Sequence, residues 1–337
     1  MIVFIILILC IICPGCGMKT ESSGINDSNK LQTVSLATWN TQTFFDGVTD
    51  GCEFPDFQKS KNWDKDKYKV RLERLCAVIE NLNADIFVFQ EIENKAILQD
   101  ISNMMAGNSW NINKQWLYGC FMKEPDAPFG CCVLSKYPIT NLKSHNIDIR
   151  TEAYPQPPLR AVMEVSVNVK NKNITLFVSH WKSKRGGAEA TDIWRKWQET
   201  ILCGCINNLL LRGEKYCIAA GDFNCDIKEF DCFYDSSSNT NIMFHSILPE
   251  YDSVSAFSPW FLENSTEKFA TETGSYFYKD KWERIDNIFA VGNVKISDFS
   301  PQQGEMWTDK RGIPLRYKYY TEEGYSDHLP LKCTITF

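Results

Sequence analysis

The feature that most constrains the fold is a pair of nearly continuous apolar runs, each placed after a long amphipathic segment. Ile86 to Gln90 (IFVFQ) follows a predicted helix over 64–82, and Tyr216 to Ala220 (YCIAA) follows one over 188–211. Strands that are buried on both faces lack the alternation of polar and apolar residues seen in half-exposed strands. Both runs therefore predict strands in the centre of a core.

The two helices are predicted from periodicity, because apolar residues recur every three or four positions. In the first they are Tyr68, Leu72, Leu75, Ile79 and Leu82, and in the second Ile193, Trp197, Ile201, Cys205 and Leu209. Shorter runs at 34–39, 131–135, 160–169, 174–180, 284–291 and 331–337 predict further strands, and 94–105 predicts another helix. The polar and aromatic stretch 226–281 has little period and predicts long loops.

Length and charge limit the organisation only loosely. A chain of 337 residues with 44% hydrophobic and 23% charged residues can build one large core. We find no repeats and no second linker, so we expect a single domain over 34–337. The net charge of −6 argues against a sequence-independent coat on nucleic acid, which needs phosphate neutralisation. It does not argue against an enzyme with one locally basic site.

The N-terminus has the pattern of an export signal. Ile2 to Ile12 is an apolar run too short for a transmembrane span, and a polar linker over 17–33 follows it. The Gly15-Cys16 pair resembles the lipidation site of a bacterial lipoprotein, although Cys13 stands where leucine is usual. We expect a signal peptide over 1–16 and a membrane anchor on Cys16, periplasmic or on the surface. An ordinary secretory signal and an uncleaved anchor are the alternatives.

Polar side chains stand at the ends of the predicted strands. A charged group there costs desolvation energy unless it is paired or bound to a metal, and functional loops lie at such ends. Six places show this pattern: Asn40, Glu91, His180, Asp222 with Asn224, Asp286, and Asp327 with His328. A single such residue is usually a turn or cap. Six together predict a site.

The same residues carry a specific family resemblance. TWN at 38–40, QEIEN at 90–94, SHWKSKRGG at 179–187, GDFN at 221–224, RIDNIF at 284–289 and SDHLPL at 326–331 occur in order. The chain resembles the endonuclease/exonuclease/phosphatase superfamily, which is deoxyribonuclease I-like, and within it the secreted bacterial nucleases, over roughly 34–337. The resemblance implies a four-layer α/β sandwich: two packed, mostly antiparallel sheets flanked by helices, with the site at one rim.

The resemblance also implies a divalent metal. Glu91 matches the principal metal ligand, Asn40 matches the amide beside it, and Asp327 belongs to the terminal Asp-His pair that completes the metal site. Mg²⁺ is the expected ion and Mn²⁺ the alternative. Gln42 departs from repair-type members, which have an aspartate there, so a second metal position is not implied.

The remaining matches imply catalytic roles. Asp222 and Asn224 match the pair that orients or activates water, Asp286 matches the partner of His328, and His180 and Arg160 match groups beside the phosphate. We expect His180 and Arg160 to supply cationic donors to the phosphate oxygens. Either Asp222 or the Asp286–His328 pair has the chemistry of a general base, and the sequence leaves this choice open.

A basic loop follows His180 directly. Lys182, Lys184 and Arg185 precede two glycines and suit the phosphates that flank a scissile bond, although a solvated turn is the simpler interpretation. We therefore expect a monomeric phosphodiesterase that hydrolyses DNA or RNA, without a protein partner. The alternatives are a phosphodiesterase or phosphatase for phospholipids or inositol phosphates, and a lipoprotein that binds without catalysis. For the lipid alternative, Trp260-Phe261 is the one apolar pair that suggests membrane insertion.

Overall fold

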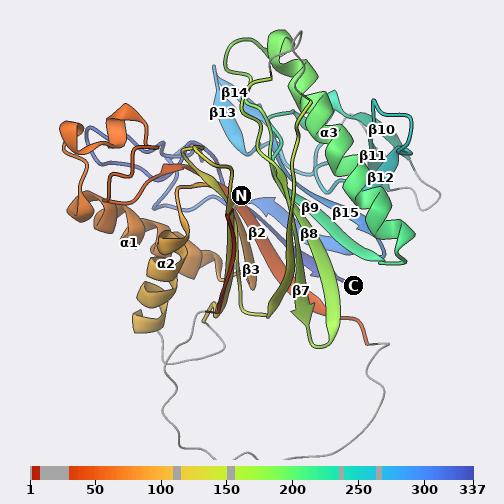
Figure 1. Ribbon diagram of the computed structural model, residues 1–337, viewed down its shortest axis with the longest axis horizontal. Helices are drawn as coiled ribbons and strands as arrows, with labels where there is room; N and C mark the ends of the chain where they lie inside the picture. Colours follow the sequence, from red (N-terminus) through yellow and green to blue (C-terminus); the bar gives the residue numbers. More distant parts are fainter. Residues whose placement is uncertain (1, 8–29, 109–114, 150–155, 235–238, 263–267) are drawn as a thin grey trace, which may run out of the picture.

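The computed structural model describes residues 2–7, 30–108, 115–149, 156–234, 239–262 and 268–337. Two sheets pack face to face between layers of helix (Figure 1). Helices α1 (Lys65–Leu82) and α2 (Lys95–Asn108) cover one sheet, and α3 (Ala188–Leu211) covers the other. This is the predicted four-layer α/β sandwich, and the fold prediction is confirmed.

In the described part of the chain, the two large sheets have seven and eight strands. The first has the order β1 (Ile2–Leu7), β4 (Tyr118–Lys123), β5 (Gly130–Ser135), β3 (Ile86–Ile92), β2 (Thr33–Phe44), β17 (Leu331–Thr336), β16 (Lys295–Pro301). The second has the order β10 (Asp231–Tyr234), β11 (Thr240–Phe244), β12 (Val254–Phe257), β15 (Asp286–Gly292), β9 (Tyr216–Asp222), β8 (Lys172–His180), β7 (Val162–Val169), β6 (Ile139–His145). A small hairpin joins β13 (Tyr276–Tyr278) to β14 (Lys281–Glu283).

Two parallel strand pairs determine where polar side chains gather. β2 pairs in parallel with β3, and β8 pairs in parallel with β9, whereas the other paired strands of the two large sheets are antiparallel. A parallel pair needs a crossover, which α1 supplies in the first sheet and α3 in the second. Each crossover leaves two carboxyl ends side by side. Asn40 and Glu91 lie at one such end, and His180 and Asp222 at the other.

The core lies in two layers. Apolar side chains of the two sheets fill the space between them and under α3, and a second cluster lies between the first sheet and α1 with α2. Helix α1 begins at its cap Asp64, whose carboxylate accepts hydrogen bonds from the amides of Asp66 and Lys67 (both 3.0 Å). It ends at Asn83, which adopts the left-handed conformation (φ 44°). Both ends agree with the predicted helix.

The prediction of long loops over 226–281 is wrong. This stretch contains β10, β11, β12, β13 and the first residue of β14, and three of these strands extend the edge of the second sheet. Each has only three to five residues. Strands this short show no measurable alternation, and they are held by pairing with their neighbours rather than by local pattern.

The predicted apolar stripe of α3 is also partly wrong. Ile193 is 47% exposed, whereas Arg195 and Gln198 are buried. Gln198 accepts a hydrogen bond from the Lys182 amide (2.6 Å) and donates one to the Arg160 carbonyl (3.3 Å). Polar residues occupy the inner face of the first turns because they bond to the loop after β8, and a search for apolar periodicity cannot find them.

The N-terminal apolar run forms part of a sheet in this structure. Ile2–Leu7 pairs antiparallel with Tyr118–Lys123 as the edge strand β1, although we expected the leader to lie outside the fold. β-branched residues favour strands, and β4 offers an otherwise open edge. Cys16 lies outside the described residues, so processing and lipidation there remain predictions. Among the helices that the structure describes, none combines the length and the hydropathy of a transmembrane span.

Candidate active site

Four predicted site residues from the two parallel pairs meet where the sheets face each other. The Asn40 Nδ2 donates to Asp222 Oδ2 (3.0 Å) and to Glu91 Oε1 (3.3 Å), which links the two sheets. The His180 Nε2 lies 3.7 Å from Glu91 Oε1 and 3.6 Å from Asp222 Oδ2. Residues up to 182 positions apart in sequence thus form one polar cluster at the rim.

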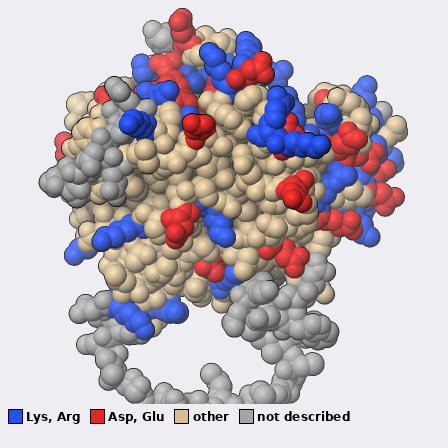
Figure 2. All heavy atoms as spheres, turned by 180° about the vertical axis from the view of Figure 1, so that it is seen from behind, with Lys and Arg blue, Asp and Glu red and all other residues tan. Residues whose placement is uncertain are grey.

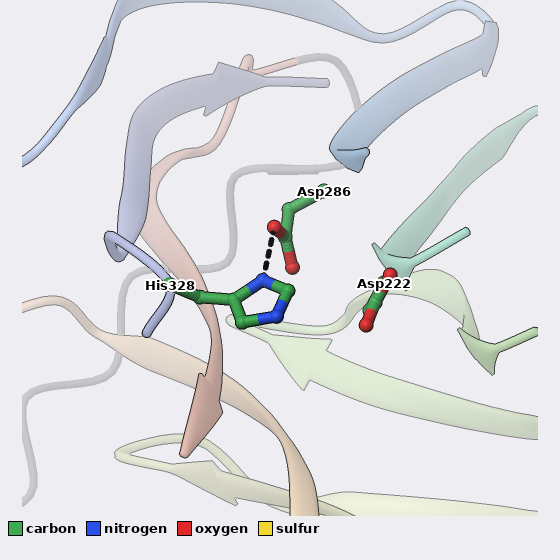
Figure 3. Close-up of side chains that lie close together, drawn as sticks. All are labelled: Asp222, Asp286 and His328. Atoms are coloured by element: carbon green, nitrogen blue, oxygen red, sulfur yellow. Dashed lines mark hydrogen bonds and ion pairs between the residues drawn. The ribbon is translucent and has the colours of Figure 1, made fainter. Parts of the chain in front are cut away.

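A histidine–aspartate pair lies beside this cluster (Figure 3). The His328 Nδ1 and Asp286 Oδ2 are 2.8 Å apart and buried. Asp286 lies opposite Asp222 in the β15–β9 register, and one ligand atom each of Asp222, Asp286 and His328 lies within 4.8 Å of the others. Because Asp286 accepts from Nδ1, the Nε2 of His328 is left to act on another group.

Hydrogen bonds between strands and the loops beside them, within each sheet, hold these residues in place. The Trp39 indole donates to the His328 carbonyl (2.9 Å), and the Trp260 indole donates to the Asp286 carbonyl (3.0 Å). The Ser326 hydroxyl donates to the Asn40 carbonyl (2.6 Å). Each bond ties a loop that carries a polar side chain to a core strand, so the rim geometry is set by buried packing.

Glu91 is directed into the site by an irregularity in β3. The register between β3 and β5 shifts between Gln90 and Ile92, and Glu91 has φ 63°. Such a bulge re-aims a side chain, and its backbone strain is typical of functional positions. The Thr43 amide, also in a left-handed turn, donates to Glu91 Oε2 (2.5 Å).

Arg71 holds the 41–43 turn through its backbone carbonyls. This buried α1 side chain donates to the carbonyls of Thr43 (2.7 Å) and Thr41 (3.2 Å), and also to the carbonyl of Gln42. Its guanidinium stacks on the Tyr317 ring at 3.8 Å. The role of Arg71 was not predicted from the sequence, because an arginine in an amphipathic helix usually faces solvent.

A glycine is required where β9 ends. Gly221 has φ 142°, and a Cβ built on it would lie 1.9 Å from the Ser179 carbonyl oxygen. No other residue allows the parallel strand β8 to approach this closely. Directly after it, the Asn224 amide donates to Asp222 Oδ1 (2.8 Å), and the Asn224 side chain donates to the Trp181 carbonyl (3.1 Å). Gly221 and Asn224 thus fix the orientation of Asp222.

The acidic groups of the site have raised pKa values. Burial and then the Asp286 charge raise the pKa of Asp222 to about 7. Burial raises the pKa of Glu91, and the Arg160 charge opposes the shift. Burial alone would lower the pKa of His328, but Asp286, Asp222 and Asp327 raise it to about 10. At neutral pH the structure therefore combines a proton acceptor with an imidazolium.

His180 is not the cationic donor that we expected. Burial, followed by the charges of Arg160 and His328, holds its pKa well below the ordinary value. Its ring stacks on Phe129 (centroids 5.8 Å apart) and is neutral at pH 7. Arg160 keeps the expected position: its guanidinium lies 5.1 Å from the Phe129 centroid and donates to the Trp181 carbonyl (3.1 Å). Arg160 is thus the cation on this side.

A family model for the endonuclease/exonuclease/phosphatase family matches residues 35–336. The chain belongs to this family. Its members are divalent-metal-dependent hydrolases of phosphoester bonds, and the predicted family resemblance is confirmed. A search of curated proteins found no match.

Solved structures share the fold at low identity. TDP2 from Caenorhabditis elegans has a TM-score of 0.54 and 13% identity, covering 92% of this chain and 78% of its own. An endonuclease/exonuclease/phosphatase family protein from Bacteroides thetaiotaomicron has a TM-score of 0.54 and 12% identity, covering 91% and 99%. A mannosyl-6-phosphatase from the same organism has a TM-score of 0.53 and 14% identity, covering 90% and 100%. At these identities the likeness concerns the fold.

The donor set fits the divalent metal of the family. Within the described residues, Glu91 has no lysine or arginine within 4.0 Å, so its carboxylate lacks a cationic partner. Asp327 is half-buried and lies beside the same cleft, 3.4 Å from Arg316 Nη2 and 4.0 Å from His328 Nε2. Carboxylate oxygens are the donors that Mg²⁺ and Mn²⁺ prefer. Glu91 and Asp327 would hold such an ion, with Asn40 beside them.

Gln42 holds the backbone of the cleft wall through both ends of its side-chain amide. Its Nε2 donates to the Tyr317 carbonyl (3.1 Å), and its Oε1 accepts from the Tyr317 amide (2.9 Å). Both ends of the amide are therefore used to hold the 317 backbone. A carboxylate has no donor and would lose one of these bonds.

The cluster opens into a cleft of about 900 Å³. The predicted Lys184 and Arg185 line it, with Lys184 also 2.5 Å from Glu229, whereas Lys182 does not line it. The lining also includes the run 316–320 (RYKYY), which sequence analysis missed. Cations that alternate with aromatic rings are typical of surfaces that bind a phosphate polymer or a sugar ring, so this run could have been found in the sequence.

Proposed function

We propose that this chain is a Mg²⁺-dependent phosphodiesterase that hydrolyses nucleic-acid phosphodiester bonds outside the cytoplasm. The observation that carries the proposal is that two features lie in the same cleft. An acid–histidine cluster of the family type lies at the base of the cleft, and a basic and aromatic run at 316–320 lies along its wall. The first suits phosphoester hydrolysis, and the second suits a substrate with several phosphates and planar bases.

In this proposal Asp222 accepts the proton of the attacking water. Its pKa of about 7 is close to the value at which a general base works best at neutral pH. Hydrogen bonds from Asn40 and Asn224 fix both carboxylate oxygens. The Asp286–His328 pair is less suited to this role, because an imidazole with a pKa of about 10 already carries its proton.

His328 and Arg160 then stabilise the charge that grows on the phosphate oxygens. The His328 Nε2 is directed by the bond from Nδ1 to Asp286, and Arg160 lines the same cleft, close enough for the charges of Glu91 and Asp222 to act on its guanidinium. The divalent ion, when bound, neutralises charge on a non-bridging oxygen. Fixed cations in a partly buried cleft act without reorganisation, so each contributes roughly a factor of 10 to 1,000.

The charge distribution suggests that the polymer contacts the protein mainly in the cleft. On the face seen in Figure 2, basic and acidic side chains of the described residues are interspersed, without a continuous basic surface. With a net charge of −6, general attraction to a polyanion is weak. Arg316, Lys318 and Arg185 in the cleft wall are the cations best placed to bind phosphates flanking the scissile bond.

The lipid alternative loses its one supporting feature. Trp260 is fully buried and Phe261 is 5% exposed, so neither offers an apolar surface for a membrane. The cleft walls instead present tyrosines and cations. We therefore place nucleic acid ahead of a phospholipid as the substrate.

A parallel digestion tests this proposal. Purified full-length chain is incubated with Mg²⁺ and supercoiled DNA, single-stranded RNA, sphingomyelin or a sugar phosphate, and kcat/KM is compared. We expect cleavage of DNA or RNA to exceed turnover of the other two by more than a hundredfold. Faster turnover of sphingomyelin or the sugar phosphate would reject the nucleic-acid proposal. Asp280→Asn, in the exposed β13–β14 turn, is the control, and Asp222→Asn is the inactive variant.

We also propose that the chain is exported and anchored by a lipid on Cys16. The apolar run Ile2 to Ile12 and the Gly15-Cys16 pair support this location. Fractionation after metabolic labelling with a fatty acid tests it. We expect label in the membrane fraction that Cys16→Ser removes, and an unlabelled wild-type chain would contradict the anchor.

A further inference from the structure

Three carboxylates gather outside the catalytic cluster. Asp50 and Glu53 lie in the loop between β2 and the short 3-10 turn Pro55–Phe57, and Glu93 follows β3. One carboxylate oxygen of each lies within 4.8 Å of the other two. Glu93 is fully buried and Glu53 is 5% exposed, whereas Asp50 is exposed, so solvent reaches the group at Asp50.

Glu93 has an oxygen without a partner. Its Oε2 accepts a hydrogen bond from the Asp46 amide (2.6 Å), but its Oε1 is buried and has no hydrogen-bond partner among the described residues. A buried carboxylate oxygen left in this way costs free energy comparable to a lost charge-assisted hydrogen bond. Because this carboxyl group belongs to the three-residue cluster, a bound cation between the carboxylates would satisfy it.

The surrounding charges favour a cation. Among the described residues, no lysine or arginine forms an ion pair with Asp50, Glu53 or Glu93. Asp46, whose amide donates to Glu93, brings a fourth negative charge next to the group. Like charges gathered without a counter-ion destabilise a fold.

The loop is already wrapped around the carboxylates. Glu53 accepts from the amides of Asp50 (2.5 Å) and Gly51 (2.9 Å), and Asp50 accepts from the Cys52 amide (3.0 Å). These bonds hold Asp50 and Glu53 before any ion arrives, and the Asp46 amide holds Glu93. A site that is largely formed in advance binds with a smaller ordering cost.

We propose that Asp50, Glu53 and Glu93 bind one calcium ion at a site separate from the catalytic metal. The three ligands offer only oxygen donors, which selects a hard cation. Carboxylates on two separate segments suit the higher and less regular coordination of Ca²⁺ better than the strict octahedron of Mg²⁺. Water reaching the site beside Asp50 would complete the coordination.

The ion would fix one wall of the cleft. Phe54 follows Glu53 directly and lines the cleft together with Phe57. The Phe54 ring packs against Phe45 (5.7 Å between centroids) and against Phe129 (5.9 Å), which in turn stacks on His180. Calcium bound to the loop thus stabilises aromatic packing next to the catalytic cluster, whichever phosphoester is the substrate.

Calcium binding can be measured without any activity assay. The Glu91→Gln variant lacks the catalytic ligand and serves as the background, and the exchange Asp50→Asn with Glu53→Gln is added to it. We measure bound ⁴⁵Ca²⁺ per chain and the melting temperature in EDTA and in Ca²⁺. The background should bind one ion and gain about 5 °C at a hundredfold excess over Kd. Asp280→Asn with Glu305→Gln, two exposed carboxylates, is the matched control.

The melting temperature in EDTA separates a calcium site from a purely structural loop. The double exchange relieves repulsion but also removes one Glu53 oxygen that accepts a loop amide, so its own melting temperature in EDTA is the reference, and Ca²⁺ should add nothing to it. If the background binds no Ca²⁺, or if the double exchange retains the ion, the calcium site is rejected. An equal fall of the melting temperature in EDTA and in Ca²⁺ would also reject it, since the carboxylates would then serve only the loop.

Discussion

Replacing Asp286 with asparagine should remove the imidazolium without moving it. The two side chains have nearly the same shape, and the hydrogen bond from His328 Nδ1 can persist at 2.8 Å. The carboxylates around His328 raise its pKa from 6.5 to about 10. This change corresponds to about 5 kcal/mol in favour of the charged ring, of which the Asp286 charge is the largest raising contribution. With that charge removed, burial favours the neutral ring at pH 7.5.

We expect kcat of Asp286→Asn to fall roughly 10- to 1,000-fold at pH 7.5, the range for a lost fixed cation beside the phosphate. The activity of the wild type should persist towards pH 10. The variant should recover part of its activity below about pH 6.5, the ordinary pKa of histidine, where His328 is again protonated. The assay is the pH profile of kcat on a labelled oligonucleotide. If kcat stays within threefold of the wild type with the same alkaline limb, the reasoning is refuted. Asp280→Asn controls for the exchange itself.

Two further predictions concern stability and positioning. Burial opposes ionisation of Glu164, but bonds to His145 and Lys143 lower its pKa to about 2. Its stabilisation should be complete above pH 4.5 and lost as the pH falls towards 2, so Glu164→Gln should cost about 1–2 kcal/mol at pH 7 and little at pH 2.5 in urea unfolding. Arg71→Met should lower kcat/KM at least roughly tenfold. An unchanged rate in steady-state kinetics would show that the 41–43 turn does not position Glu91.

The catalytic cluster was predictable because it depends on strand ends. Asn40, Glu91, His180 and Asp222 each follow an apolar run, and the carboxyl ends of parallel strands meet at one rim. The sequence alone therefore indicates which side chains converge. Their order along the chain also matches a family, which predicts the sandwich around them.

Other features depend on tertiary contacts that no local pattern shows. An amide at position 42, rather than a carboxylate, can both donate to and accept from the Tyr317 backbone, which lies 275 positions away. The charge of His180 depends on its burial and on Arg160 and His328, which come from other segments. The short strands β10 to β14 are stabilised by their neighbours. A run such as RYKYY at 316–320 was visible, but only the fold brings it to the cleft.

The most direct test of the central claim is metal-dependent cleavage of polynucleotide at this site. Purified wild type and Glu91→Gln are incubated with a 5′-labelled oligonucleotide in EDTA, and Mg²⁺ is then restored. We expect the wild type to be inactive in EDTA and to cut internucleotide bonds once Mg²⁺ is added, and Glu91→Gln to remain at least roughly a hundredfold slower. Cleavage by Glu91→Gln at the wild-type rate, or an oligonucleotide left intact by the Mg²⁺-loaded wild type, would contradict the account.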